Sequence, residues 1–232
     1  YSINSMEPGL GMISLPFYLP KNEKTDEIFT FEDLAGLSEG TGKIAMLKAD
    51  VDNLGYIFSA SLGESMSVSR YATLSRMLDF FFSAYINYKI QTAWPTVYTV
   101  FSGGDDLCVV GPWKDVIRFG KDLQNDFMRF TGRNPGITIS AGTVLSSPHM
   151  PVRTVADSAE VSLEISKETK WKNSSTLFGI PAVWDRIPSL LEFGEELISF
   201  VREGKITKGI LYRLLQYGRS ENEVKKGNVA EK

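Results

Sequence analysis

The sequence predicts an α+β domain with the ferredoxin-like order of elements: strand, helix, strand, strand, helix, strand. One observation is a short apolar run at residues 43–50, followed by two more at 96–102 and 106–111 that flank a glycine turn. Another is the three- and four-residue spacing of apolar side chains over 69–90 and 113–130, which is typical of amphipathic helices. A final strand-like run, ITISAGTVL, covers residues 137–145. In this order the third strand lies between the first two and runs antiparallel to them.

The elements before the second strand follow from local patterns. Residues 1–42 are rich in proline and glycine, and we expect the tail of a preceding module and a linker. Within them LPFYLP suggests a short strand, and TFEDLAGLSEG suggests a capped helical turn. Residues 43–50 have the length of a strand buried on both faces. Serines at 65, 67 and 69 offer caps for the helix over 69–90.

The elements after the glycine turn continue the pattern. A helix is expected at 113–130, a third helix at 152–169 and a strand at 175–179. After Pro188 the spacing is helical again, and the last residues, RSENEVKKGNVAEK, resemble a solvated tail. The expected organisation is therefore a linker over 1–42, a central domain over 43–188, and the start of a C-terminal helical domain with a tail over 189–232.

Composition excludes several classes of protein. The net charge of −3 argues against a strong nucleic-acid footprint on this chain alone. The chain has one cysteine and one histidine, which excludes a disulfide framework, a cysteine-rich zinc site and a histidine–aspartate nuclease site within it. No run reaches the ~18 apolar residues of a membrane helix. We expect a reducing, cytoplasmic location and no membrane partner. Because the sequence starts without Met and without a signal-peptide pattern, it is expected to be a piece of a longer protein.

The candidate catalytic residues are four aspartates in two turns. Asp50 and Asp52 end the first strand, and Asp105 and Asp106 lie at the tip of the glycine hairpin. The predicted topology places the carboxyl end of strand one beside this hairpin, so the four carboxylates should converge. At ~4 Å and an effective dielectric of ~20, each like-charge pair costs about 4 kcal/mol. Protonation of one or two acids could offset this cost, and so could a divalent cation.

A cation held by carboxylates alone, without His or Cys, is typical of Mg²⁺ or Mn²⁺, and two such ions suit a phosphoryl displacement. Other residues near these turns could then bind a nucleotide. Gly103 and Gly104 lack Cβ atoms, so a phosphate can approach the backbone closely. The amides of Asn53, Leu54 and Gly55 could form an anion-binding nest. The remaining candidates are Lys167 and Lys172, which could reach phosphates but are commonly surface residues, and Ser140, for which packing is the commoner role.

The ordered motifs LKADVDNLG, YTVFSGGDDL, ITISAGTVL and KNSSTLFG resemble the palm domain of the large subunit of type III-A, or Csm-type, CRISPR effector complexes, the CRISPR polymerase family. The resemblance covers roughly residues 10–217. This palm is distantly similar to GGDEF diguanylate cyclases and to class III nucleotidyl cyclases. The fold it implies is a nucleotidyl-cyclase-like palm followed by the start of a helical domain.

The resemblance implies that ATP is converted into cyclic oligoadenylates when the complex binds a target RNA. Asp50, Asp105 and Asp106 match the metal-binding positions of the family, and Lys167 and Lys172 lie where the cyclase relatives carry phosphate-contacting basic residues. The implied partners are a second palm domain that completes the active site, the guide-RNA-capping subunit, the small subunit, and guide and target RNA through the complex. The N-terminal nuclease domain and first palm of that family are not visible, and its single-stranded DNase activity is carried onto no residue present.

Two other functions remain open at this stage. One is a GTP-using cyclase of the GGDEF kind. The hairpin reads Asp-Asp-Leu rather than Glu-Phe, and no arginine occurs between Arg76 and Arg118, so the product-inhibition motif of those enzymes is absent. The other is a non-catalytic scaffold that binds guide RNA and neighbouring subunits. A scaffold does not need the acidic cluster.

Overall fold

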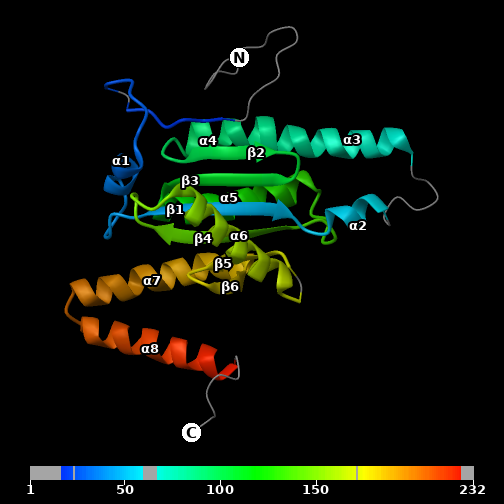
Figure 1. The fold of residues 1–232 in the computed structure, drawn as a ribbon. Coiled ribbons are helices and arrows are strands. Elements are labelled where there is room, and N and C mark those ends of the chain that lie inside the picture. Colours follow the sequence, from blue (N-terminus) through cyan, green and yellow to red (C-terminus); the bar gives the residue numbers. More distant parts are fainter. Residues whose placement is uncertain (1–16, 23, 60–66, 171, 226–232) are drawn as a thin grey trace. The chain divides into compact units, whose positions relative to one another are not determined.

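The computed structural model describes residues 17–22, 24–59, 67–170 and 172–225 (Figure 1). Its centre is a six-stranded sheet with the strand order β2-β3-β1-β4-β5-β6. The strands are β1 (Ile44–Val51), β2 (Tyr98–Gly103), β3 (Asp106–Pro112), β4 (Ile139–Ser146), β5 (Ser174–Leu177) and β6 (Ile180–Val183). β3 and β4 both pair with β1 in the antiparallel sense, and β2 pairs antiparallel with β3. β5 adds to β4 in parallel. The predicted ferredoxin-like order is confirmed.

The helices fill the connections between strands. They are α1 (Phe31–Gly36), α2 (Leu54–Ser59), α3 (Val68–Asp79), the π-helix η2 (Phe80–Ile86), α4 (Asn87–Ala93), α5 (Trp113–Phe130), α6 (Val152–Glu168), the 3-10 turn η3 (Trp184–Arg186), α7 (Ile187–Arg202) and α8 (Lys208–Lys225). The predicted helix over 69–90 is therefore three consecutive segments, and Ser67 is its N-cap.

The structure differs from the sequence expectations at four elements. Residues 17–20 of LPFYLP are not in a strand, and the first two residues of that motif lie outside the described chain. α2 and β6 were not expected: α2 has only six residues, and β6 is a largely exposed edge strand that contains Pro181, so neither shows a clear period. α8 continues to Lys225, so residues 219–225 are helical rather than an extended tail. The rest of that expected tail lies outside the described residues.

α5 and α6 pack on opposite faces of β1. Leu47 lies next to Gly120 of α5, whereas Met46 belongs to a buried apolar cluster with Val155 and Ala159 of α6. Side chains alternate between the two faces of a strand, so successive residues of β1 enter different halves of the core. The part of the core on the α5 side of the sheet contains the aromatic side chains of η2 and α5. Phe81 and Phe127 are in edge contact there, at 5.3 Å between ring centroids.

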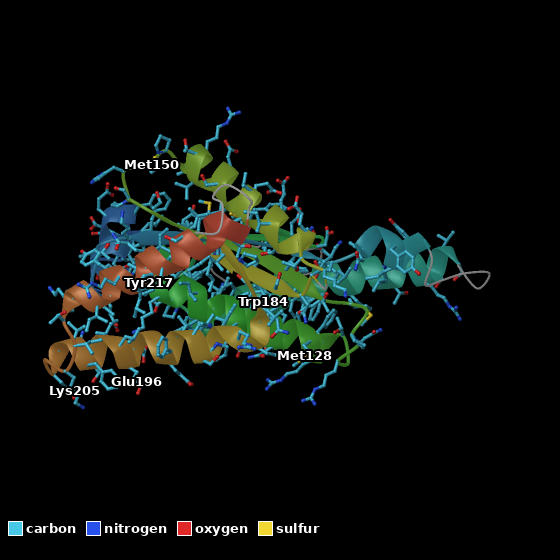
Figure 2. The ribbon with its side chains drawn as sticks, turned by 90° about the horizontal axis from the view of Figure 1, so that it is seen from below. Met128, Met150, Trp184, Glu196, Lys205 and Tyr217 are labelled. Atoms are coloured by element: carbon cyan, nitrogen blue, oxygen red, sulfur yellow. The ribbon has the colours of Figure 1, made fainter. Side chains whose placement is uncertain are left out.

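The described chain consists of two compact units, one ending at Trp184 and the other beginning at Asp185. Trp184, labelled in Figure 2, is 2% exposed and its indole N–H donates to the carbonyl oxygen of Ile139 at 2.8 Å. The second unit contains α7 and α8, whose apolar side chains line a groove of about 430 Å³. Within the described residues, no helix is long and apolar enough to cross a lipid bilayer.

Candidate active site

The β2–β3 hairpin brings its acidic tip to the carboxyl end of β1. Gly103 pairs with Asp106 across the hairpin, so Gly104 and Asp105 form the two-residue turn. Gly104 has a φ of +64°, a conformation that glycine adopts without the steric cost paid by other residues. On the other side of β3, Asp106 is the register partner of Asp50. The turn chemistry and the antiparallel register together place acids from two distant segments side by side.

Three carboxylates meet there. One oxygen from each of Asp50, Asp105 and Asp106 lies within 4.8 Å of the other two. Burial and, secondarily, the charge of Asp106 raise the pKa of Asp105. Burial and the charge of Glu160 raise the pKa of Asp106, partly opposed by Lys48. Both pKa values are thus raised mainly by burial, and a bound divalent cation would favour the ionised form of both acids. The donor set is all oxygen, so it fits Mg²⁺ or Mn²⁺.

Asp52 does not join this group. Its side chain is 0% exposed, and its Oδ2 accepts hydrogen bonds from Thr138 Oγ1 at 2.7 Å, from Ser140 Oγ at 3.1 Å and from the Asn173 amide at 3.0 Å. The backbone explains this position, because the Asp52 amide donates to the Thr138 carbonyl and so extends the pairing of β1 with the β4 segment. The expectation that Asp52 binds the metal with the other three acids is therefore not what the geometry favours. Ser140 is fully buried and donates to Asp52.

The turn after β1 contains Asn53, Leu54 and Gly55, the residues predicted to form an anion nest. Asn53 has a φ of +57°, and α2 begins at the next residue, Leu54. The Asn53 carbonyl accepts a hydrogen bond from the Ile57 amide, and its side-chain Oδ1 accepts one from Lys172 Nζ at 2.7 Å. Gly55 is exposed in the first turn of α2. The predicted residues Asn53, Leu54 and Gly55 thus lie three to five positions after Asp50, beside a lysine.

Both predicted lysines reach the segment that carries Asp50. Lys167, in the last turn of α6, forms an ion pair with the carboxylate of Asp50. Burial and, secondarily, the charge of Lys172 lower the pKa of Lys167, and the ion pair with Asp50 acts in the opposite direction. Lys172 lies in the loop between α6 and β5 and contacts Asn53. Lys167 at the end of α6 and Lys172 in the following loop therefore place positive charge at two points near the end of β1.

A pocket of about 380 Å³ opens beside the acids, which is within the range of small-molecule sites. Its lining comprises Lys48, Ala49, Asp50, Val100, Phe101, Asp106, Leu107, Cys108, Ala156, Glu160, Leu163 and Lys167. Lys48 Nζ and Glu160 Oε2 form an ion pair at 2.7 Å within this lining. Neither residue was predicted to belong to the site, because a strand lysine and a helix glutamate 112 positions apart form no local sequence pattern.

Comparison with known proteins agrees with this geometry. Residues 43–176, more than half of the chain, match the family model of the second palm domain of Cas10/Cmr2. The chain belongs to this family. The Cas10/Csm1 single-strand-specific deoxyribonuclease of the subtype III-A CRISPR system of Methanocaldococcus jannaschii is 36% identical over 197 residues. That alignment covers 74% of this chain and 25% of the relative, so the chain spans about a quarter of the length of that protein.

Solved structures support the same assignment of the Cas10 palm. The crystal structure of a Csm1–Csm4 cassette in complex with AMPPNP matches with a TM-score of 0.73 at 26% identity, over 92% of this chain and 34% of that one. The cassette in complex with cA3 matches with a TM-score of 0.74 at 25% identity, over 94% of this chain and 34% of that one. The predicted resemblance to the palm of the type III-A large subunit is confirmed.

Proposed function

We propose that this chain is the nucleotidyltransferase palm of a type III-A CRISPR complex, and that it converts ATP into cyclic oligoadenylates when the complex binds target RNA. One observation carries the proposal: Asp50, Asp105 and Asp106 converge within 4.8 Å beside a pocket lined by Lys167. The similarity to cassettes crystallised with AMPPNP and with cA3 supports adenine nucleotides as the ligands.

The reaction joins a ribose hydroxyl of one nucleotide to the α-phosphorus of another, and pyrophosphate leaves as the bond to it breaks. Asp50, Asp105 and Asp106 would hold Mg²⁺ or Mn²⁺, and such an ion stabilises the charge that develops on the phosphoryl oxygens. Lys167 and Lys172 would bind the triphosphate electrostatically, as lysines do at many phosphate sites. The glycines of the hairpin leave its backbone open to a close-lying phosphate.

The chain supplies one part of a larger site. It spans about a quarter of its curated relative and matches the second palm domain, and the family resemblance implies that another palm domain holds the other ATP. We therefore propose a composite site between this palm, over residues 43–188, and the other palm domain. In this proposal a helical domain starts at residue 189. The proposed partners are the guide-RNA-capping subunit, the small subunit, and guide and target RNA. Such a complex would act in the cytoplasm.

The decisive experiment replaces Asp105 and Asp106 by Ala in the full-length subunit within the assembled complex. With target RNA, ATP and Mn²⁺ present, product formation should fall by about 100-fold or more, because transition-state charge loses its stabilisation. The matched control replaces two exposed acids of α6, Asp157→Ala with Glu164→Ala, and should retain wild-type rates. Wild-type turnover by the hairpin variant would refute the proposal.

The two alternative functions are separated by the same preparation. Parallel reactions with ATP and with GTP identify the base from the mass of the product, and a GTP product would favour the GGDEF-like cyclase. A scaffold predicts no Mn²⁺-dependent binding of ATP, whereas a ligand at 100 times its Kd should stabilise the protein by about 2.7 kcal/mol. A thermal shift with ATP that requires Mn²⁺ would exclude the scaffold.

A further inference from the structure

The buried carboxylate of Asp52 has no part in the proposed chemistry. It is 0% exposed and lies outside the group formed by Asp50, Asp105 and Asp106. An ionised side chain is removed from water only when other groups satisfy it. Here Oδ2 has three donors from separate places: Thr138 just before β4, Ser140 within β4, and the Asn173 amide just before β5. Oδ1 is buried and has no hydrogen-bond partner among the described residues, so these three bonds are what hold the carboxylate.

Asp52 and its neighbour Asn53 form a two-point clasp on the loop between α6 and β5. Asp52 Oδ2 accepts from the Asn173 amide at 3.0 Å, and Asn53 Oδ1 accepts from Lys172 Nζ at 2.7 Å. Two consecutive residues of one turn therefore hold two consecutive residues of the loop. We refer to these four residues as the clasp.

The loop needs such a restraint. Lys172 and Asn173 have φ values of +50° and +43°, a left-handed conformation that asparagine tolerates but that is uncommon and strained for lysine. A strained backbone persists only when its surroundings determine it, and the hydrogen bond from the Asn173 amide to a fully buried carboxylate does so here. Together with the hydrogen bond from the Lys172 amide to the Thr169 carbonyl at 3.0 Å, this bond fixes the position from which the Lys172 side chain extends.

The clasp lies beside the proposed nucleotide site. Asn53 follows Asp50 by three positions, and the end of α6 that precedes the loop is tied to Asp50 through the ion pair with Lys167. Thus one of the two lysines that could neutralise a triphosphate, Lys167, is held by α6, whereas Lys172 depends on the conformation of the following loop, which Asp52 anchors.

We propose that Asp52 is a positioning residue which holds Lys172 against the β1–α2 turn, where Lys172 binds the triphosphate, and that Asp52 does not ligate the metal. The inference rests on the proposed function, because it assigns a further residue to the same site. When Asp52 is replaced by Asn, an amide group takes the place of one carboxylate oxygen and the charge that orders three donors is lost. The affinity for ATP falls, while the metal site keeps its three ligands.

The kinetic test uses the full-length subunit in the assembled complex, with rates measured against ATP at several Mn²⁺ concentrations. Asp52→Asn should raise the KM for ATP about 10-fold while kcat changes by less than about 3-fold, because ground-state and transition-state binding weaken together. The Mn²⁺ concentration for half-maximal rate should not change. Asp50→Asn, which removes a proposed ligand, should instead lower kcat by about 100-fold or more. A fall in kcat for Asp52→Asn with a shifted Mn²⁺ requirement would overturn the inference.

A double-mutant cycle tests whether Asp52 acts through Lys172. Lys172→Met should raise the KM for ATP as Asp52→Asn does, and the double variant should be no worse than the worse single variant, since both remove one interaction. A merely structural role for Asp52 predicts that the two fold-changes multiply, and that result would overturn the proposal. Lys170→Met, a neighbouring exposed lysine of the same loop, is the matched control and should leave the KM unchanged.

Hydrogen exchange gives a readout that does not depend on catalysis. In Asp52→Asn, the Asn173 amide should exchange about 10-fold faster, because its hydrogen bond to the side chain at position 52 has been weakened. Peptides from α5 should exchange as in the wild type. Faster exchange throughout the palm would show general destabilisation and overturn the inference. If the wild-type complex forms no oligoadenylate, the proposed function fails, and hydrogen exchange still decides whether the clasp exists.

Discussion

The two faces of β1 have different compositions, and the difference locates the candidate site. Toward α5 the strand presents Ala45, Leu47, Ala49 and Val51, each at most 2% exposed. Toward α6 it presents Ile44 and Met46, then Lys48 and Asp50. α6 matches this order, with Val155 and Ala159 near the first pair, Glu160 at Lys48 and Lys167 at Asp50. One face is apolar over its whole length, whereas the other changes from apolar to charged toward its carboxyl end.

This arrangement joins stability to chemistry within a single strand. Fully burying a Leu or Val side chain contributes about 1.5–3 kcal/mol, and on the α5 face Leu47 and Val51 are both buried. This burial holds β1 against α5. The backbone of Asp50, at the end of the strand, is therefore positioned even if the contacts of its own side chain add little to stability. Functional groups on rigid elements are positioned more accurately than groups on loops.

The largest effect that tests this comparison should come from the α6 face at Gly142→Ala. A Cβ at this position of β4 would lie 2.2 Å from the Leu163 amide nitrogen and 2.5 Å from the Ser162 carbonyl carbon, which are backbone atoms of α6. α6 must then move away from the sheet, so we expect a loss of roughly 3 kcal/mol or more in the free energy of unfolding. Urea unfolding followed by tryptophan fluorescence measures it.

The matched control for this prediction lies on the α5 face. In Gly120→Ala the new Cβ would lie 2.7 Å from Leu47 Cδ1, the end of a flexible side chain that can change rotamer. Alanine also favours a helix over glycine by about 1 kcal/mol, so the net change should stay within about 1 kcal/mol. If Gly120→Ala were the more damaging of the two, the close backbone packing inferred for the α6 face would be wrong.

A second prediction concerns Asp126, a buried carboxylate that pairs with a lysine of this chain, unlike the cluster of Asp50, Asp105 and Asp106, which we propose binds a metal ion. Asp126, in the helical layer on the α5 face, is 6% exposed and pairs with Lys89 Nζ at 2.5 Å. Lys89→Met removes the nearest cation from that buried charge and leaves only Arg129 Nη1 at 3.8 Å, so the free energy of unfolding should fall by about 2–4 kcal/mol at pH 7. Urea unfolding checks this, with the exposed Lys24→Met as a control that should change stability by less than about 0.5 kcal/mol.

The pH dependence of this pair has a defined sign. Burial alone would lower the pKa of Lys89, but the hydrogen bond and charge of Asp126 raise it above its ordinary value of 10.5. A lysine whose pKa is raised in the folded state stabilises the protein fully below the unfolded pKa, and that stabilisation is lost as pH rises through the folded pKa. The difference between wild type and Lys89→Met should therefore be constant at neutral pH and narrow above pH 10.5. A difference that instead narrowed in acid would assign the effect to another group.

Much of the site's framework was predictable because it depends on strand order alone. Apolar run lengths and the glycine hairpin specify the topology, and the topology makes Asp50 a register partner of Asp106. Asp52 could not be separated from Asp50 in this way. Residues two apart in a strand share a face, but the donors that hold Asp52, at Thr138 and Asn173, lie 86 and 121 positions away. Likewise, nothing local indicates that Lys48 meets Glu160.

The smallest predicted effect lies at the amino end of the α6 face of β1, where we expect the residues to contribute to stability and not to catalysis. α1 covers Ile44 and Met46 there, and it begins with a capping box: the Asp33 amide donates to Thr30 Oγ1 at 3.2 Å, and the Thr30 amide donates to Asp33 Oδ2 at 2.8 Å. Thr30→Ala removes the side-chain acceptor, so stability should fall by about 1 kcal/mol.

Product formation by Thr30→Ala at saturating ATP should equal that of the wild type, because α1 covers the end of β1 opposite to Asp50. The exposed Thr41→Ala is the matched control and should change neither quantity. Urea unfolding and oligoadenylate yield, measured on the same preparations, separate the two ends of the face. A loss of product in Thr30→Ala as large as that in Asp50→Asn would mean that the charged end of β1 is not the functional one, and that the graded face has a structural meaning only.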